Sequence, residues 1–171
     1  AAVTGAKTIT ATFTGKQYKA MLQGIGATLQ SSATINLDAI YHNAYSSGFW
    51  LDSTGKYGYV SGTSSWGSNY LVLNGSNHVS LTKQDSFKVI EITFYITTMP
   101  TSENAYLVGN WESGGGGIVL KTDGYLQAQV YVGGTWYTAN SKTTLSTATK
   151  YRAALVHDGT NLKLYLDDFQ V

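Results

Sequence analysis

The sequence predicts an all-β protein built from two antiparallel sheets, and three observations lead to that class. Composition is the first: 19 Gly, 13 Tyr and a single Pro, with abundant Thr, Ser and Asn, favour pleated strands joined by turns. The second is a two-residue alternation of apolar and polar side chains in several segments, typical of strands with one buried face. The third is the spacing of these segments, about 8 to 12 residues, with turn residues between them, which favours a sandwich.

Length and charge set outer limits on organisation and partners. With 171 residues and 43% hydrophobic content, we expect one sandwich domain over 1–171, in which 1–60 form an N-terminal arm or strands that complete the sandwich. A net charge of +1 with 12% charged residues indicates no nucleic-acid partner. No apolar run approaches the roughly 18 residues of a membrane span. The absence of Cys excludes a disulfide framework and a thiol nucleophile.

The most regular stretch is Tyr151–Val171, which predicts a hairpin. The segment Arg152–Val156 is short and, after Arg152, apolar, and the leucines of 162–166 (LKLYL) alternate with polar neighbours. Such a period of two indicates one buried and one solvent-exposed face. Between the two segments, Asp158 and Gly159 are expected to supply the positive φ values that a hairpin turn needs.

The other strands are predicted from the same alternation. Gly114–Gly117 is interpreted as a loop between strands, because it lacks the Gly-Lys-Ser/Thr ending of a phosphate-binding loop. Ser46–Ser68 is interpreted as loops around one short strand. The expected strands are Lys7–Thr14, Thr34–Tyr41, Tyr57–Val60, Phe87–Thr97, Ala105–Asn110, Ile118–Lys121, Gly124–Val132 and Thr135–Ala139.

Three segments carry a resemblance to a known family. They are ALVHDGT leading into LKLYLDD within Tyr151–Val171, the long strand Phe87–Thr97, and Tyr70–Leu81, which is similar to an opening hairpin. Together they resemble laminin-G-like domains, from Asn69 to Val171. The resemblance implies the fold of that family, a concanavalin A-like jelly roll.

The sequence departs from this family after its last predicted strand, where the family's domains usually continue with further strands. Three explanations stay open: the chain is a fragment, residues 1–60 supply the missing strands in permuted order, or another subunit supplies them by strand addition. An uncovered sheet edge is costly or prone to aggregation. The Thr-rich segment Thr8–Thr14 is the candidate strand for closing it.

Catalysis is not expected. Glucanases that share the jelly roll carry two carboxylates on one strand, typically as E-x-D-x-E, and none of the ten acidic residues forms that pattern. Asp167 and Asp168 are adjacent, so as strand residues they would point to opposite faces, while Glu103 and Glu112 flank a turn. The histidines at 42, 78 and 157 are isolated, so a nucleophilic triad is unsupported.

A structural Ca²⁺ is left open, and no other cofactor is expected. Laminin-G-like domains often hold calcium at the rim of the sandwich with loop carboxylates and carbonyl oxygens. By this resemblance Asp52, Asp85, Asp123 and Asp158 would contribute. A loop Asp is more often a turn former than a metal ligand.

Aromatic and amide side chains on wet faces make the better case for a binding site. If the strands that carry them share one sheet, Gly124–Val132 presents its Tyr and Gln residues together with Tyr95 and Tyr165. Trp111, Trp136 and Tyr137, in or near turns, would form a second platform at the rim. Flat rings, amides and hydroxyls suit the apolar faces and hydroxyl rims of sugars. The predicted ligand-binding residues are Tyr95, Trp111, Tyr125, Gln127, Gln129, Tyr131, Trp136, Tyr137 and Tyr165.

These features predict a non-catalytic recognition or adhesion module with a glycan or surface polysaccharide as partner. Its expected location is extracellular, at a cell surface or in a virion. The alternative is a structural subunit of a phage particle, tail fibre or extracellular filament, which contacts other subunits through its N-terminal strand or a free sheet edge. A glycan binder exposes its aromatic residues, whereas a structural subunit buries them or its edge in a neighbour.

Overall fold

The computed structural model describes residues 48–51, 57–62, 65–67, 70–81, 88–111 and 115–171. Within these ranges the chain forms strands and no helix, and it divides into two compact units, 48–81 and 88–171. No helix in the described part has the length and apolarity needed to cross a membrane. The strands expected at Lys7–Thr14 and Thr34–Tyr41 lie outside the described residues.

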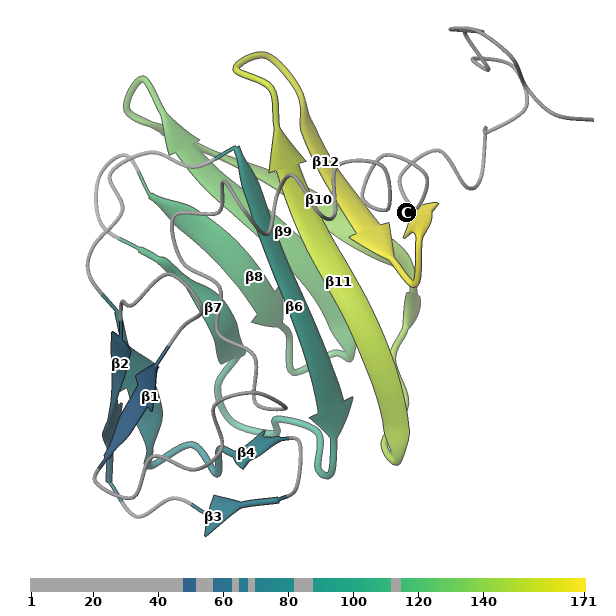
Figure 1. The fold of residues 1–171 in the computed structure, drawn as a ribbon. Coiled ribbons are helices and arrows are strands. Elements are labelled where there is room, and N and C mark those ends of the chain that lie inside the picture. Colours follow the sequence, from purple (N-terminus) through teal and green to yellow (C-terminus); the bar gives the residue numbers. More distant parts are fainter. Residues whose placement is uncertain (1–47, 52–56, 63–64, 68–69, 82–87, 112–114) are drawn as a thin grey trace, which may run out of the picture. The chain divides into compact units, whose positions relative to one another are not determined.

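The larger unit contains two antiparallel sheets of four strands each (Figure 1). The first, called here the β7–β10 sheet, has the order β10-β9-β8-β7, and the second, the β6–β13 sheet, has the order β13-β12-β11-β6. The first sheet comprises β7 (Ala105–Asn110), β8 (Gly116–Leu120), β9 (Tyr125–Val132) and β10 (Thr135–Thr144). The second comprises β6 (Val89–Ile96), β11 (Thr149–His157), β12 (Leu162–Leu166) and β13 (Phe169–Gln170).

One apolar core draws on both sheets, which confirms the all-β class with two antiparallel sheets and is consistent with a sandwich. The alternation of each strand sends every second side chain inward. Register then places inward residues opposite one another, such as Leu120 with Leu126 and Leu155 with Leu164. The buried core residues are Ile96, Ile118, Leu120, Leu126, Ala128, Leu145, Ala153, Leu155 and Leu164.

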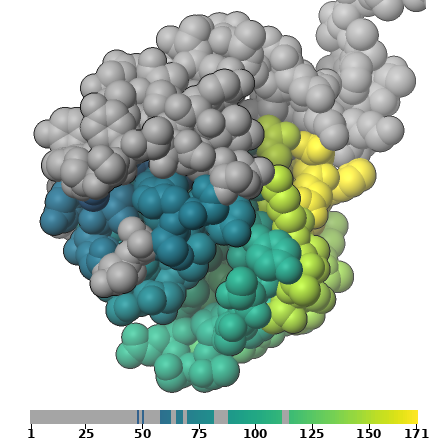
Figure 2. Space-filling view, turned by 60° about the horizontal axis from the view of Figure 1, so that its bottom comes forward, coloured from purple at the N-terminus to yellow at the C-terminus, as the bar shows by residue number. Residues whose placement is uncertain are grey.

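The predicted hairpin at the C-terminal end is confirmed: β11 pairs with β12 in antiparallel register. Gly159 has a φ of +98°, but Asp158 lies outside the positive-φ region, so that part of the prediction is wrong. The carboxylate of Asp158 stabilises the turn instead, since its Oδ1 accepts hydrogen bonds from the backbone N–H groups of Thr160 at 2.9 Å and Asn161 at 2.7 Å. On the other side of β11, its start lies beside the end of β6 (Figure 2).

Two predicted boundaries in this unit are wrong. Gly116 and Gly117 belong to β8 rather than to a loop, since Gly117 pairs with Gly109 of β7 on one side and with Gln129 of β9 on the other. Strand β10 continues to Thr144, beyond the expected end at Ala139. It is the last strand of its sheet and mostly exposed, so polar residues occupy it without apolar alternation.

The smaller unit consists of short strands. β1 (Phe49–Leu51), β2 (Tyr57–Ser61) and β5 (His78–Ser80) form one sheet, and β3 (Ser65–Trp66) pairs with β4 (Leu71–Val72). Strands β1 and β3 fall where only loops were expected.

The predicted opening hairpin over Tyr70–Leu81 is wrong, because β4 pairs with β3 and β5 pairs with β2. The loop between β4 and β5 is closed by Asn77, which is 6% exposed. Its Oδ1 accepts a hydrogen bond from Asn74 N at 2.7 Å, and its Nδ2 donates to Val72 O at 3.2 Å.

Candidate functional site

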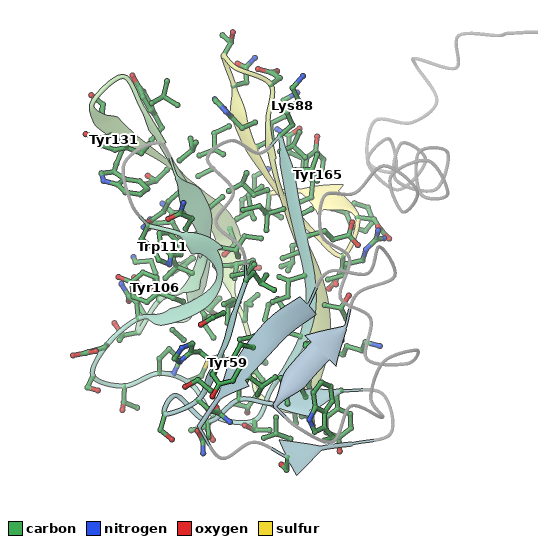
Figure 3. The ribbon with its side chains drawn as sticks, turned by 60° about the vertical axis from the view of Figure 1, so that its left-hand side comes forward. Tyr59, Lys88, Tyr106, Trp111, Tyr131 and Tyr165 are labelled. Carbon is green, nitrogen blue, oxygen red and sulfur yellow. The ribbon has the colours of Figure 1, made fainter. Side chains whose placement is uncertain are left out.

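The outer face of the β7–β10 sheet gathers four aromatic rings, called here the aromatic cluster. They come from β7 (Tyr106), from the residue after it (Trp111), from β9 (Tyr131) and from β10 (Trp136), and Figure 3 labels three of them. The ring centroids of Tyr106 and Trp111 are 4.8 Å apart, those of Trp111 and Trp136 are 6.4 Å apart, and those of Tyr131 and Trp136 are 5.1 Å apart. The rings therefore form one connected series across the sheet.

A pair of glycines makes room for Trp111. Gly109 of β7 and Gly117 of β8 are register partners. A Cβ atom on Gly117 would lie 2.3 Å from Val108 O, 2.7 Å from Gly109 Cα and 2.7 Å from Cη2 of Trp111. A Cβ atom on Gly109 would lie 3.0 Å from Cζ2 of the same indole. The glycine-rich sequence thus lets the indole lie close against the sheet backbone.

Beside the aromatic cluster, three amide side chains form a hydrogen-bonded chain, called here the amide chain. Gln129 Nε2 donates to Gln127 Oε1, and Gln127 Nε2 donates to Asn140 Oδ1 at 2.7 Å. The register pairs Gln127 directly with Asn140, and Gln129 with Thr138, so all four side chains share the outer face. The amide chain fixes the orientation of Gln129 without involving any charged group.

The cluster and the amide chain border an open hollow of about 430 Å³. Its lining residues are Tyr106, Trp111, Gln129, Trp136 and Thr138, and none of them carries a charge. A second hollow of about 430 Å³ adjoins it across Tyr106, lined also by Ser102, Glu103, Asn104 and Thr122. The first hollow offers aromatic faces, an amide and a hydroxyl, the set of groups that suits an uncharged polar ring.

Tyr125 lies on the same outer face but outside the cluster. It starts β9, whereas Tyr131 lies near the end of that strand, about 20 Å further along. It follows the β8–β9 turn, where Lys121 Nζ and Asp123 Oδ2 form a 2.7 Å ion pair. The hydrogen bond from Lys121 lowers the pKa of Asp123 below its ordinary value.

Three other predicted residues lie elsewhere. Tyr137 pairs with the inward residue Val130, so it lies on the face opposite to Trp136. It is 54% exposed, on the last strand of the sheet. Tyr95 and Tyr165 belong to the β6–β13 sheet. The premise that their strands share a sheet with Gly124–Val132 is therefore wrong.

The structure also merges two groups that the sequence kept apart. Trp111 and Trp136, expected at a separate rim platform, lie with Tyr131 and Gln129 in one site. Sequence reasoning missed Tyr106, although its position between Ala105 and Leu107 in an alternating strand marks it as outward-facing.

The outer face of the β6–β13 sheet has a different chemistry, centred on Arg152. Its guanidinium donates to Glu91 Oε1 at 2.6 Å and to Asp168 Oδ1 at 2.9 Å. Asp167 accepts from Arg152 N at 2.9 Å and donates its own N–H to Arg152 O at 2.8 Å. Burial raises the pKa of the nearby strand residue Tyr165.

Asp167 and Asp168 are turn residues with φ values of +47° and +74°. The interpretation that they lie on a strand and face opposite ways is therefore wrong, since both bind Arg152. In the part of the chain that is described, no three His, Cys, Asp or Glu side chains gather where they would hold a metal ion. Asp52 and Asp85 lie outside that part.

Comparison of the chain with known protein families, with curated proteins and with solved structures finds no match in any of the three.

Proposed function

We propose that the protein is a non-catalytic recognition or adhesion module that binds a glycan through the aromatic cluster and Gln129. The observation that carries this proposal is the hollow in which two Trp residues, a Tyr, an amide and a hydroxyl converge. Sugars combine apolar C–H faces with a rim of hydroxyl groups. Aromatic rings contact the former and amide or hydroxyl groups bind the latter.

The partial exposure of the rings supports a role in binding. Trp136 is 41% exposed and Tyr106 is 62% exposed, so neither serves mainly to fill the core. Trp111 is half-buried and held against the backbone of Gly109 and Gly117, which orders it before any ligand arrives. A ring that is already ordered loses less conformational entropy when a ligand binds.

The fold and the location of the protein form a further part of the proposal. We propose that the sandwich is a jelly roll of the concanavalin A-like, laminin-G-like type and that the protein works outside the cell, at a cell surface or in a virion. The β11–β12 hairpin, which carries the most regular of the resembling segments, supports this assignment. An experimentally determined structure that traces the strand order of residues 1–171 tests it.

A glycan array probed with the full chain tests the binding function. The wild-type protein is expected to retain a subset of glycans, and a Trp136→Ala variant with an unchanged circular dichroism spectrum is expected to lose them. Rings and amides bind sugars without a cation, so the same spots are expected with a chelator present. An array without any retained glycan, probed with correctly folded protein, contradicts the proposal.

The second candidate is a structural subunit, and the sheet ends favour it. Strand β10 is the last strand of one sheet and is ten residues long, and its residue Tyr137 is exposed. Such an edge presents backbone donors and acceptors for pairing with another chain. Sedimentation velocity distinguishes the two: a monomer across a range of concentrations supports the binding module, and self-assembly that ends on Tyr137→Lys substitution supports the structural subunit.

A further inference from the structure

The hollow beside the aromatic cluster lacks the groups that an anionic ligand requires. Sites for uronate, sulfate or sialate groups rely on Arg or Lys, which form charge-assisted hydrogen bonds with carboxylates and sulfates. Neither residue type lines this hollow. Lys121, a basic residue at the β8–β9 turn, is paired with Asp123, and Glu103 in the adjoining hollow repels an anion.

The amide chain has a direction, and that direction decides what Gln129 offers to a ligand. Gln129 donates through Nε2 to Gln127, which donates in turn to Asn140. The side-chain oxygens of Gln127 and Asn140 each accept a hydrogen bond from the preceding amide. Gln129 begins the amide chain, so no preceding amide donates to its oxygen. Among the described residues none donates to Gln129 Oε1. Since Gln129 lines the hollow, this oxygen is available as an acceptor for a ligand hydroxyl.

We infer that the ligand is an uncharged glycan and that Gln129 orients it by accepting a hydrogen bond from a sugar hydroxyl through Oε1. This inference rests on the proposed function and deepens it. The rings of Trp111 and Trp136 contact the apolar face of the sugar, which supplies affinity. Gln127 is a positioning residue: it holds Gln129 Nε2, so that the acceptor oxygen and not the amide nitrogen faces the ligand.

Isothermal titration of the full chain with two sets of soluble polysaccharides tests the ligand class. The neutral set comprises a β-glucan, a galactomannan and a xyloglucan, and the acidic set comprises polygalacturonate, heparin and chondroitin sulfate. We expect binding to a member of the neutral set, with the same Kd at low and high salt, because no ion pair forms. Binding confined to the acidic set and lost at high salt overturns the inference about charge but leaves glycan binding in place.

Variants of the amide chain test the role of Gln129. Replacing Gln129 with Leu is expected to weaken binding roughly 3- to 10-fold, the range of one neutral hydrogen bond. Gln127→Leu removes the acceptor that holds Gln129 and is expected to weaken binding by a similar factor. Gln127→Glu keeps that acceptor and is expected to bind with the affinity of the wild type. Tyr95→Ala, on the other sheet, is the control that leaves Kd unchanged.

Each remaining outcome decides one point. If the wild type and the Gln127 and Gln129 variants bind neutral glycans equally well, the proposed role of the amide chain is wrong. The inference that the ligand is uncharged then still holds. Loss of binding in both Gln127→Leu and Gln127→Glu also overturns the positioning role, provided that both variants keep the wild-type melting temperature. No binding to either set contradicts the proposed function itself, since the aromatic cluster then has no glycan ligand.

Discussion

The outer faces of the two sheets cover one core but differ in chemistry. On the β7–β10 sheet, three aromatic rings, one amide and one hydroxyl line a hollow, and none of the lining residues carries a charge. On the β6–β13 sheet, Arg152 binds Glu91 and Asp168. These three charged groups of the second face thus pair with one another, whereas the first face leaves rings and one carbonyl oxygen for a ligand. Outward polarity alone therefore does not identify a binding face, and the partners of each polar group must also be known.

Gly117→Ala is expected to cause the largest loss of stability among the variants considered. The structural distortion is expected at the aromatic cluster and not on the other sheet. The new Cβ lies 2.3 Å from Val108 O and 2.7 Å from Gly109 Cα, and backbone atoms have little room to move. We expect a loss of about 3 kcal/mol in the free energy of unfolding, together with loss of glycan binding, as measured by urea denaturation and titration.

Two further variants separate the causes of this loss. Gly133→Ala is the matched control, because its new Cβ meets nothing within 4 Å and only its φ of +58° opposes the change; it is expected to cost about 1 kcal/mol. In a Trp111→Ala background Gly117→Ala is expected to cost nearly as much as in the wild type, since the closest atoms belong to the backbone. A cost that vanishes in that background contradicts this explanation.

Arg152→Ala is expected to have a smaller effect, confined to the other face. The change removes both ion pairs and leaves the partly buried carboxylate of Asp168 without this partner, a loss of about 1 to 2 kcal/mol. Because the groups are partly exposed, part of the difference disappears at high salt. Lys150→Ala, at the next outward position of β11, is the control. Weaker glycan binding by Arg152→Ala with an intact fold contradicts the separation of the two faces.

Asp158→Asn is expected to have the smallest effect, and one that depends on pH. Hydrogen bonds from Asn161 and Thr160 lower the pKa of Asp158 from 3.8 to about 2. A lowered carboxyl pKa stabilises the fold above pH 3.8, and this contribution is lost as the pH falls through about 2. The wild type is therefore expected to melt slightly above Asp158→Asn at neutral pH, and the two melting curves converge near pH 2. A constant difference across this interval contradicts the assignment.

Sequence patterns predict the positions of the strands in this protein better than they predict which strands pair in a sheet. Alternation within a strand is local, so Gly124–Val132 and Phe87–Thr97 reveal β9 and β6 with little error. Which strands share a sheet depends on pairing between distant segments, and so Tyr95 was grouped with Tyr131 although different sheets carry them.

The candidate site was predicted in part for the same reason. Gln127, Gln129 and Tyr131 share one face of one strand, so alternation alone groups them. The contact of Trp111 with Trp136 joins residues after β7 and in β10 and needs the whole sheet order. The contact of Trp111 with two glycines likewise cannot be predicted from local sequence, since Gly109 and Gly117 come together only through strand pairing.

The neighbouring residues Trp136 and Tyr137 offer the most direct test of the binding face. They are 41% and 54% exposed and lie on opposite sides of β10, so their Ala variants alter the two sides of one strand while the fold is kept. Titration with the glycan retained by the wild type is expected to show affinity at least about tenfold lower for Trp136→Ala and within about twofold of wild type for Tyr137→Ala. Equal losses in both variants, or a loss only in Tyr137→Ala, would contradict the assignment of binding to the outer face of the β7–β10 sheet.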